Sequence, residues 1–334
     1  MPGSAFRKDA AVKKSIMAAC GETPVTPLHL PGNHFYVKRD DLLPFSLGGN
    51  KVRIAAAFLE DMEAKGADCL IMYGNSRSNL CRVLVSACHQ ENIPCMMICS
   101  DDPDGARRVT ANSRLVELFG TEILYCAKNA IAPAVDEAFR RAKERGYVPY
   151  YIYGNRLGEG NEGVAARAYA KAYGEICREE ARTGRTFDYI FHASGTGSTQ
   201  SGLIAGHLLA GDRRRIVGIS VSRDRERGTR ILTEGVRAFF EDAGKALPEH
   251  FGEAICLEDA YLAGGYGQYD DRIRKTIRRM FLEESLPLDP TYTGKAFAGM
   301  LDYLEKHEIR DANILFLHTG GTPLFYDYLL SEGL

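Results

Sequence analysis

The chain has 334 residues, 45% of them hydrophobic and 26% charged, and a formal net charge of -2. A charge so close to zero gives no sign of a general nucleic-acid or membrane surface, no apolar run approaches the ~20 residues of a membrane span, and the N-terminus lacks a signal-peptide core. The length allows two domains or one large α/β body with an inserted lobe. Nine cysteines without a Cys-x-x-Cys pair favour a reducing cytosol over disulfides or zinc.

The first 35 residues, rich in Pro and Gly, are expected to form an irregular arm. Beyond it, apolar runs of strand and helix length alternate along the chain. In the first half we expect strands at 68–74, 93–100, 121–126 and 148–154, and helices at 52–65, 78–92, 104–120 and 130–146. The glycine-rich segment 155–163 is the expected crossover between domains.

After this crossover we expect helices at 164–181, 199–210, 269–285 and 296–307, strands at 189–194, 215–222 and 312–318, and a short final helix. The charged stretch 223–227 is expected to be a solvated helix start, because its charges nearly balance. Repeated β-α alternation is typical of mainly parallel sheets flanked by helices. The sequence therefore predicts an α/β fold.

A glycine pair, Gly48-Gly49, precedes Asn50 and Lys51 at the start of the first long helix. Two glycines let the backbone turn tightly and approach a ligand, and the asparagine can cap the helix. Lys51 then falls in the first turn, where the helix dipole and partial burial lower the pKa of its amine. The pattern suits either a nucleophilic lysine or a solvated lysine at a helix start.

Residues 193–202, Ala-Ser-Gly-Thr-Gly-Ser-Thr-Gln-Ser-Gly, join a strand to a helix. Free N–H groups, hydroxyls and the helix dipole converge there, so the loop can hold an anion. A P-loop would need a lysine, and the dinucleotide fingerprint would need glycine in place of Gln200. The loop is therefore either a cradle for a phosphate monoester that needs no magnesium or a tight structural turn.

Further loops at 75–79, 264–267 and 319–322 are expected at the carboxyl ends of the strands, where ligands bind in parallel sheets. Their side chains, with one on a nearby turn, offer hydroxyls and an amide: Ser78, Asn79, Tyr266, Tyr292 and Thr319. Ser78 and Asn79 also suit helix caps, and the tyrosines also suit packed aromatics. No nucleophile elbow or Ser-His-Asp order is present, which disfavours hydrolase chemistry.

A pyridoxal phosphate enzyme requires a lysine, a loop that binds the phosphate and hydroxyl groups, and it needs no metal cluster. Ordered motifs add to this reading: Lys38-Arg39-Asp40-Asp41, Gly48 to Arg53, Ser78-Asn79, Thr196 to Gln200, Leu288 to Lys295 and His318 to Gly321. From about residue 20 to the end, the chain resembles the fold-type II (tryptophan synthase β-like) pyridoxal phosphate family of D-cysteine desulfhydrase and 1-aminocyclopropane-1-carboxylate (ACC) deaminase.

The resemblance implies a role for each matched residue. Lys51 would be joined to the cofactor aldehyde and would move the substrate proton, Asn79 would bond the ring hydroxyl, and Thr319 would face the pyridine nitrogen. Tyr266 and Tyr292 would donate protons beside the substrate. The phosphate would be wrapped by Gly195, Thr196, Gly197, Ser198 and Thr199, and the substrate would be bound by Asn50, Arg77, Ser78 and Asn79, with Ser78 also able to serve as a nucleophile or base.

The resemblance also implies two lobes, a small one at 52–155 and a large one formed by 1–51 and 156–334, and a cytoplasmic homodimer acting on a small amino acid. Thr293 stands where ACC deaminases carry glutamate, whereas the 196–200 loop resembles the deaminase loop. Arg77 replaces the usual glutamine, and either faces solvent or recognises a second anionic group.

The leading function is therefore β-elimination of D-cysteine to pyruvate, sulfide and ammonia. ACC deamination to 2-oxobutanoate is the nearest alternative, followed by elimination from, or β-replacement on, an anionic amino acid such as cysteate. A non-catalytic pyridoxal phosphate carrier or amino-acid sensor is the alternative from a different class.

Overall fold

The strands of the larger sheet are apolar runs that are buried on both faces. β7 (Tyr189–Ser194) and β8 (Arg215–Ser220) are buried along all but their first residue, as parallel strands covered by helices on both sides must be. The sheet has the order β1-β2-β10-β7-β8-β9, and its neighbours are parallel except for the antiparallel β1–β2 pair. Its other strands are β1 (Val25–Leu28), β2 (His34–Lys38), β9 (Cys256–Glu258) and β10 (Asn313–Leu317).

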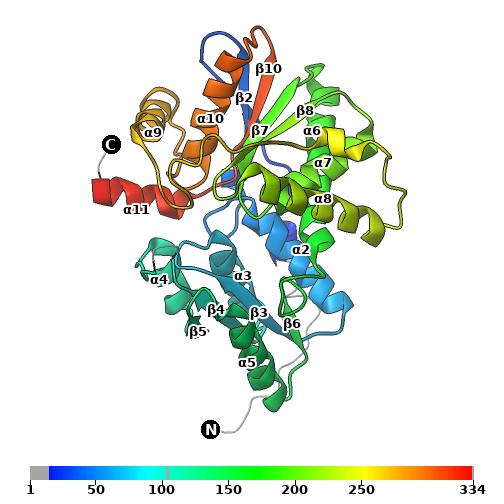
Figure 1. Cartoon of the computed structure of the whole chain (residues 1–334), viewed down its shortest axis with the longest axis vertical. Helices are drawn as coiled ribbons and strands as arrows, with labels where there is room; N and C mark the ends of the chain where they lie inside the picture. Colours follow the sequence, from blue (N-terminus) through cyan, green and yellow to red (C-terminus); the bar gives the residue numbers. More distant parts are fainter. Residues whose placement is uncertain (1–14, 103–104, 333–334) are drawn as a thin grey trace.

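A smaller sheet is built from one continuous part of the chain. Its order is β5-β4-β3-β6 and all its strands are parallel. The computed structural model, which describes residues 15–102 and 105–332, places this sheet apart from the larger one (Figure 1). The strands are β3 (Cys69–Gly74), β4 (Cys95–Ser100), β5 (Glu122–Cys126) and β6 (Pro149–Tyr151). The exact lobe boundaries at residues 51/52 and 155/156 stay a prediction.

The helices connect successive strands and cover the faces of both sheets (Figure 1). The first half of the described chain contains α1 (Ser15–Ala18), α2 (Lys51–Ala64), α3 (Asn79–Gln90), α4 (Ala111–Leu118), α5 (Ile131–Glu144) and the 3-10 helix η2 (Asp40–Leu42). The second half contains α6 (Glu162–Thr183), α7 (Ser198–Ala210), α8 (Arg225–Asp242), α9 (Asp271–Glu284), α10 (Thr293–Lys306), α11 (Thr322–Glu332) and the 3-10 helix η3 (Phe251–Ala254).

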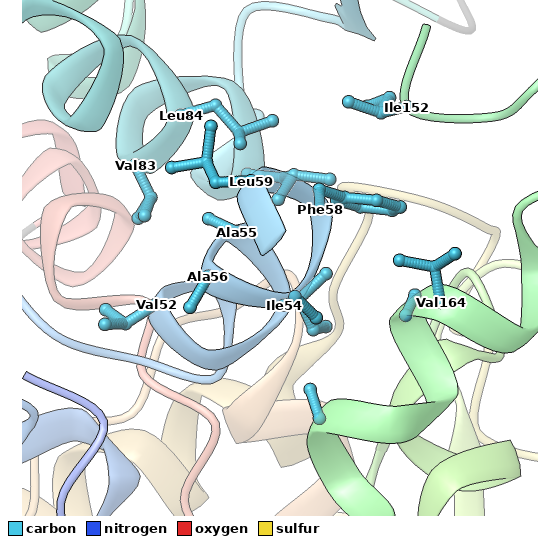
Figure 2. Close-up of a cluster of buried hydrophobic side chains, with 14 of the residues drawn as sticks. Val52, Ile54, Ala55, Ala56, Phe58, Leu59, Val83, Leu84, Ile152 and Val164 are labelled. Carbon is cyan, nitrogen blue, oxygen red and sulfur yellow. The ribbon is translucent and has the colours of Figure 1, made fainter. Parts of the chain in front are cut away.

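Helix α2 packs between the two sheets because it is apolar on nearly every side. Its residues from Val52 to Leu59 are all buried, including three consecutive alanines that let neighbouring helices approach closely. Figure 2 shows Phe58 and Leu59 among Leu84 of α3, Ile152 and Val164 of α6. The helix that begins at Lys51 is therefore held firmly by both parts of the fold.

A second core lies between the larger sheet and helices α9, α10 and α11. Phe297 of α10 meets Phe316 of β10 edge to face, with ring centroids 4.9 Å apart, and Phe325 of α11 belongs to the same cluster. This core supports the loops that leave the carboxyl ends of β7, β8 and β10.

The predicted α/β fold with mainly parallel sheets is confirmed, but the expected irregular arm is wrong over its described part. Residues 25–28 and 34–38 form β1 and β2, because Phe35 and Val37 alternate into the core while β2 pairs with β10. Residues 1–14 of the arm lie outside the described residues. The expected strand at 93–100 begins at Cys95, and the expected helix at 104–120 covers 111–118 in the described chain. Strand β9, with three residues, was too short to produce a sequence signal.

All nine cysteines are free, and several of them pack in the core as small hydrophobic residues. Within residues 15–102 and 105–332, no helix is long and apolar enough to cross a membrane. The same ranges contain no group of three or more His, Cys, Asp or Glu side chains arranged to hold a metal ion.

Candidate active site

Lys51 is the first residue of α2, and its amine is half-buried without a partner. In the described part of the chain it makes no hydrogen bond or ion pair, and burial lowers the pKa of its amine to about 8. A lysine with this pKa is partly neutral near pH 7.5, so it can act as a nucleophile and as a base. Its predicted place in the first turn is confirmed.

The expectation that Asn50 caps this helix is wrong. Asn50 has helical backbone angles (φ -53°, ψ -23°) and makes no side-chain cap bond, because a capping side chain needs an extended backbone to reach back to the helix N–H groups. Its amide instead donates to Thr199 Oγ1 over 2.9 Å. This bond joins the start of α2 to the loop after β7. The residue before Lys51 is therefore in direct contact with the predicted phosphate-binding loop.

The turn before Lys51 lies directly against the loop after β10. Asn50 N donates to Thr319 O (3.1 Å), and a Cβ on Gly320 would stand 2.5 Å from Gly49 Cα. Gly49 and Gly320 both have positive φ (97° and 93°). Two glycines are thus needed here for close backbone contact as well as for conformation, and they bring Thr319 beside Lys51.

The loop between β7 and α7 has the geometry of an anion site. Gly197 is left-handed (φ 94°), α7 begins at Ser198, and the Thr196 and Ser198 hydroxyls lie 3.3 Å apart. A Cβ on Gly197 would come within 2.9 Å of Ile231, so a larger residue does not fit. The N–H groups of the first helical turn have no intrahelical acceptors and point out of the helix end.

In the smaller lobe, Ser78 and Asn79 lie at the start of α3. Ser78 Oγ accepts from Cys81 N (3.1 Å), so it does cap the helix, and Gly74 allows its close approach because a Cβ there would stand 2.6 Å from Ser78 Cβ. Asn79 is buried, and its Oδ1 accepts from Asn112 Nδ2 (3.0 Å). The NH₂ group of Asn79 is therefore left to donate to a ligand.

The two predicted tyrosines meet. The hydroxyls of Tyr266 and Tyr292 are 2.6 Å apart and their rings pack edge to face. Asp289 builds the turn below Tyr292 by accepting from three backbone N–H groups at 291–293, and Lys295 Nζ donates to the carbonyls of Leu262 and Gly265 in the loop that carries Tyr266. Burial raises the pKa of Tyr266 to about 12 and raises the pKa of Tyr292 well above its ordinary value, so both phenols stay protonated near neutral pH.

Arg77 does not face solvent. Its Nη1 pairs with the fully buried carboxylate of Asp102 at 2.9 Å, and its guanidinium lies against Gly267, where a Cβ would stand 3.3 Å from Arg77 Cζ. Its positive charge opposes the rise that burial causes in the pKa of Tyr266. Arg77 therefore links the smaller lobe to the loop of Tyr266.

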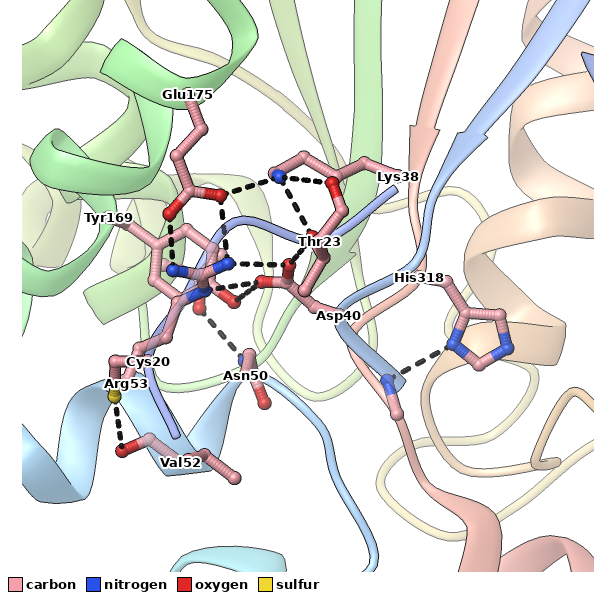
Figure 3. A network of polar contacts seen from close by, with 12 residues as sticks. Cys20, Thr23, Lys38, Asp40, Asn50, Val52, Arg53, Tyr169, Glu175 and His318 are labelled. Carbon is pink, nitrogen blue, oxygen red and sulfur yellow. Dashed lines mark hydrogen bonds and ion pairs between the residues drawn. The ribbon is translucent and has the colours of Figure 1, made fainter. Parts of the chain in front are cut away.

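A buried ionic network packs against the start of α2 (Figure 3). Arg53 donates to both oxygens of Asp40 (3.0 and 3.1 Å) and to Glu175, which also accepts from Lys38 (2.7 Å). Although burial alone would raise the pKa of the Asp40 carboxyl, Arg53 holds it below its ordinary value. The two cations and two anions balance, and removing one partner from such a buried pair typically costs about 3–5 kcal/mol.

Sequence reasoning missed several residues that this geometry depends on. Arg82 of α3 and Asn112 of α4 hold Asn79, and Arg223 follows β8 with a buried Nε that has no hydrogen-bond partner. An arginine between apolar residues (Leu80, Cys81, Val83 and Leu84) was a weak signal for Arg82. Asn112 lies 33 residues from its partner, so the sequence held no signal for that contact.

A cavity of about 150 Å³ adjoins Ser78, Asp102 and Asn112 in the smaller lobe. At roughly 30 Å³ for each water molecule, it has room for about five waters. Its lining includes neither Lys51, the 195–199 loop nor the two tyrosines, so this cavity lies beside Ser78 on the side of the smaller lobe and is not the space between the candidate site residues.

Known proteins resemble this chain over most of its length. The family model described as "Pyridoxal-phosphate dependent enzyme" matches residues 16–320. Over 306 residues the chain is 31% identical to the D-cysteine desulfhydrase of Klebsiella pneumoniae, with 89% of each chain covered. The crystal structure of an ACC deaminase homologue is similar with a TM-score of 0.79 and 30% identity, covering 95% of this chain and 98% of that one. The structure of O-ureido-L-serine synthase (TM-score 0.66, 17% identity, 95% and 94% covered) shares the fold.

Proposed function

Because the chain belongs to the family of pyridoxal-phosphate dependent enzymes, we propose that it is a deaminating lyase that acts on a small amino acid by β-elimination. The observation that carries the proposal is the half-buried amine of Lys51, which has no partner among the described residues and follows Asn50, the residue that bonds Thr199 of the 195–199 loop. When bound, the cofactor supplies an aldehyde that joins to amines and a ring that withdraws electrons.

The residues present fit this cofactor. Lys51 offers the amine, the glycine-rich start of α7 offers N–H groups and hydroxyls for the phosphate, and Asn79 offers an NH₂ group for the ring oxygen. Thr319 offers a neutral hydroxyl for the pyridine nitrogen, which leaves this nitrogen largely unprotonated and favours elimination over transamination. Each of these assignments is part of the proposal.

Proton transfer is assigned to Lys51 and the tyrosine pair. Lys51 in its neutral form takes the α-proton of the substrate, and its lowered pKa makes that form accessible near neutral pH. Tyr266 and Tyr292 are protonated and share a 2.6 Å hydrogen bond, so one can orient the other to donate a proton to the leaving group. Asn50, Arg77, Ser78 and Asn79 are assigned to the substrate side.

D-cysteine is the leading substrate, giving pyruvate, sulfide and ammonia. The position that carries glutamate in ACC deaminases is Thr293 here, and its side chain is sealed into the turn. Thr293 Oγ1 donates to Asp289 Oδ1 (2.9 Å) and accepts from Asp289 N (2.8 Å), and the residue is fully buried. A threonine held in this way supports elimination rather than opening of a cyclopropane ring, and ACC deamination remains the runner-up.

A second candidate substrate class, an anionic amino acid such as cysteate, is favoured by two arginines. Arg77 lies against the loop of Tyr266. Arg223 follows the carboxyl end of β8, and this segment lies beside the predicted phosphate loop, because Val221 is 3.5 Å from the position of a Cβ on Gly195. In the described residues Arg223 has no ion-pair partner. A guanidinium without a counter-ion suits a carboxylate or sulfonate.

The experiment compares the purified wild type with Lys51→Ala and with Lys275→Ala, an exposed lysine of α9. We expect a visible absorption band and a cofactor adduct on Lys51 by mass spectrometry, both lost in Lys51→Ala and kept in Lys275→Ala. An adduct on another side chain, or no adduct, would overturn the proposal.

Release of 2-oxo acid from D-cysteine, L-cysteine, ACC and L-cysteate then separates the candidate substrates. Fastest turnover of D-cysteine is expected, whereas 2-oxobutanoate from ACC or pyruvate from cysteate would favour the alternatives. Cofactor binding without 2-oxo acid from any amino acid would favour the non-catalytic sensor.

A further inference from the structure

Arg82 is a buried cation without an anion. It is 1% exposed, lies in the first turns of α3, and in the described part of the chain has no carboxylate partner. Arg53, the other deeply buried arginine of this region, bonds two carboxylates, Asp40 and Glu175. Both arginines are buried, but the charge of Arg53 is neutralised by carboxylates whereas the charge of Arg82 is not.

The acceptors around Arg82 are all neutral. Its Nε donates to Asn112 Oδ1 (2.9 Å), its Nη1 donates to Ser46 Oγ (3.0 Å), and its Nη2 lies 3.5 Å from both Gly48 O and Asn79 Oδ1. Burial lowers the pKa of this guanidinium to about 10, yet it remains charged at neutral pH. A buried charge without a counter-ion is costly, which suggests that the missing anion arrives with the ligand.

The hydrogen bonds from Arg82 also have a fixed direction. A guanidinium can only donate, so the oxygen of Asn112 must face Arg82 and its NH₂ must face away. That NH₂ donates to Asn79 Oδ1 (3.0 Å) and to Arg77 O (3.1 Å). The oxygen of Asn79 is thereby occupied, and its NH₂ donates to none of the described residues and is left for a ligand.

We propose that Arg82 is a positioning residue for the cofactor ring oxygen: it orients the Asn79 amide through Asn112, and its charge balances the ionised ring oxygen. This inference rests on the proposed function, in which Asn79 contacts that oxygen. Arg82 would also have a second role, because it donates to Ser46 and Gly48 in the turn before Lys51.

The test uses Arg82→Met, Arg82→Lys, Asn112→Leu and, as a control, Arg178→Met, whose arginine is exposed on α6 and pairs with Glu22. Three quantities are measured: the melting temperatures of apoprotein and holoprotein, the dissociation constant of pyridoxal phosphate, and the pH midpoint of the visible absorption of the bound cofactor. None of them requires a substrate.

In Arg82→Met we expect the apoprotein to melt at or above the wild-type temperature, because a costly buried charge is gone. The cofactor should bind at least about tenfold more weakly, and the absorption midpoint should rise by roughly one pH unit, because a nearby positive charge favours the deprotonated form. Arg82→Lys should restore most of the midpoint. Asn112→Leu should weaken binding while moving the midpoint less, and Arg178→Met should change none of the three.

The inference is overturned if Arg82→Met destabilises apoprotein and holoprotein equally and leaves affinity and midpoint unchanged. If Arg82→Met does not fold, the lysine and Asn112 variants decide, since unchanged affinity and midpoint in both would reject it. Failure of the wild type to bind the cofactor would instead reject the proposed function.

Discussion

The phenol oxygens of Tyr266 and Tyr292 lie 2.6 Å apart, although the two residues come from separate loops. The loop of Tyr266 is held by Lys295 through two carbonyls, and the turn of Tyr292 is built on Asp289. Both phenols have raised pKa values and stay protonated near neutral pH, as the proposed role of this pair in proton donation requires.

Replacing either hydroxyl of this pair should slow catalysis. We expect Tyr292→Phe and Tyr266→Phe to lower kcat by roughly 10²-fold, the usual contribution of one positioned acid, with little change in cofactor binding. Tyr269→Phe is the matched control, because its hydroxyl bonds Glu332 on the surface. Equal kcat values for all three variants would show that the pair takes no part in proton transfer.

The pH dependence of cofactor capture should report the amine of Lys51. Because burial lowers the pKa of this amine to about 8, the rate at which apoprotein joins to pyridoxal phosphate should rise with pH and level off above about 8. Stopped-flow absorbance measures this rate. A midpoint near the ordinary value of 10.5 would contradict the burial of the amine.

The same shift affects stability, with a sign that can be checked. Between about pH 8 and 10.5 the unfolded chain holds a proton on Lys51 that the folded chain has lost, so the stability contributed by this group rises with pH across that window. Urea unfolding of apoprotein should therefore show a steeper rise for wild type than for Lys51→Met. Parallel curves would contradict this assignment.

The close contact of Gly49 and Gly320 should be required for cofactor binding. In Gly320→Ala the new Cβ would stand 2.5 Å from Gly49 Cα at a positive φ, so the Lys51 turn must move and cofactor affinity should fall at least about tenfold. Gly66→Ala is the control, because Gly66 also has positive φ but has nothing within 4 Å of the added Cβ. Equal affinity in both variants would show that the contact is dispensable.

The arginines near the site should affect anionic substrates most. We expect Arg223→Gln to lower kcat/KM on L-cysteate about tenfold more than on D-cysteine, because one guanidinium–anion interaction is lost, and Arg77→Gln to do so less strongly because Asp102 compensates part of its charge. Arg225→Gln, an exposed arginine paired with Glu258, is the control. Equal losses on both substrates would dismiss a role in side-chain recognition.

Local patterns predicted most of the fold. The alternation of apolar runs located β7 at 189–194 without error and placed Lys51 at the start of α2. Predictions failed where the local signal was short or misleading: β9 has three residues, β1 and β2 lie in a segment rich in Pro and Gly, and Asn50 resembles a cap but bonds Thr199. In these cases a partner distant in sequence decided the local structure.

By itself, the sequence determined the α/β class, the pyridoxal phosphate family and the residue types available at each loop, because turn glycines, helix starts and ordered motifs are local features. The tertiary structure alone decided which side chains meet: the Tyr266–Tyr292 bond, the Arg77–Asp102 pair and the Arg82–Asn112–Asn79 chain join residues 25 to 33 positions apart. Burial also depends on the whole fold, so the free amine of Lys51 and the unpaired charge of Arg82 became visible only when the two sheets and α2 were packed together.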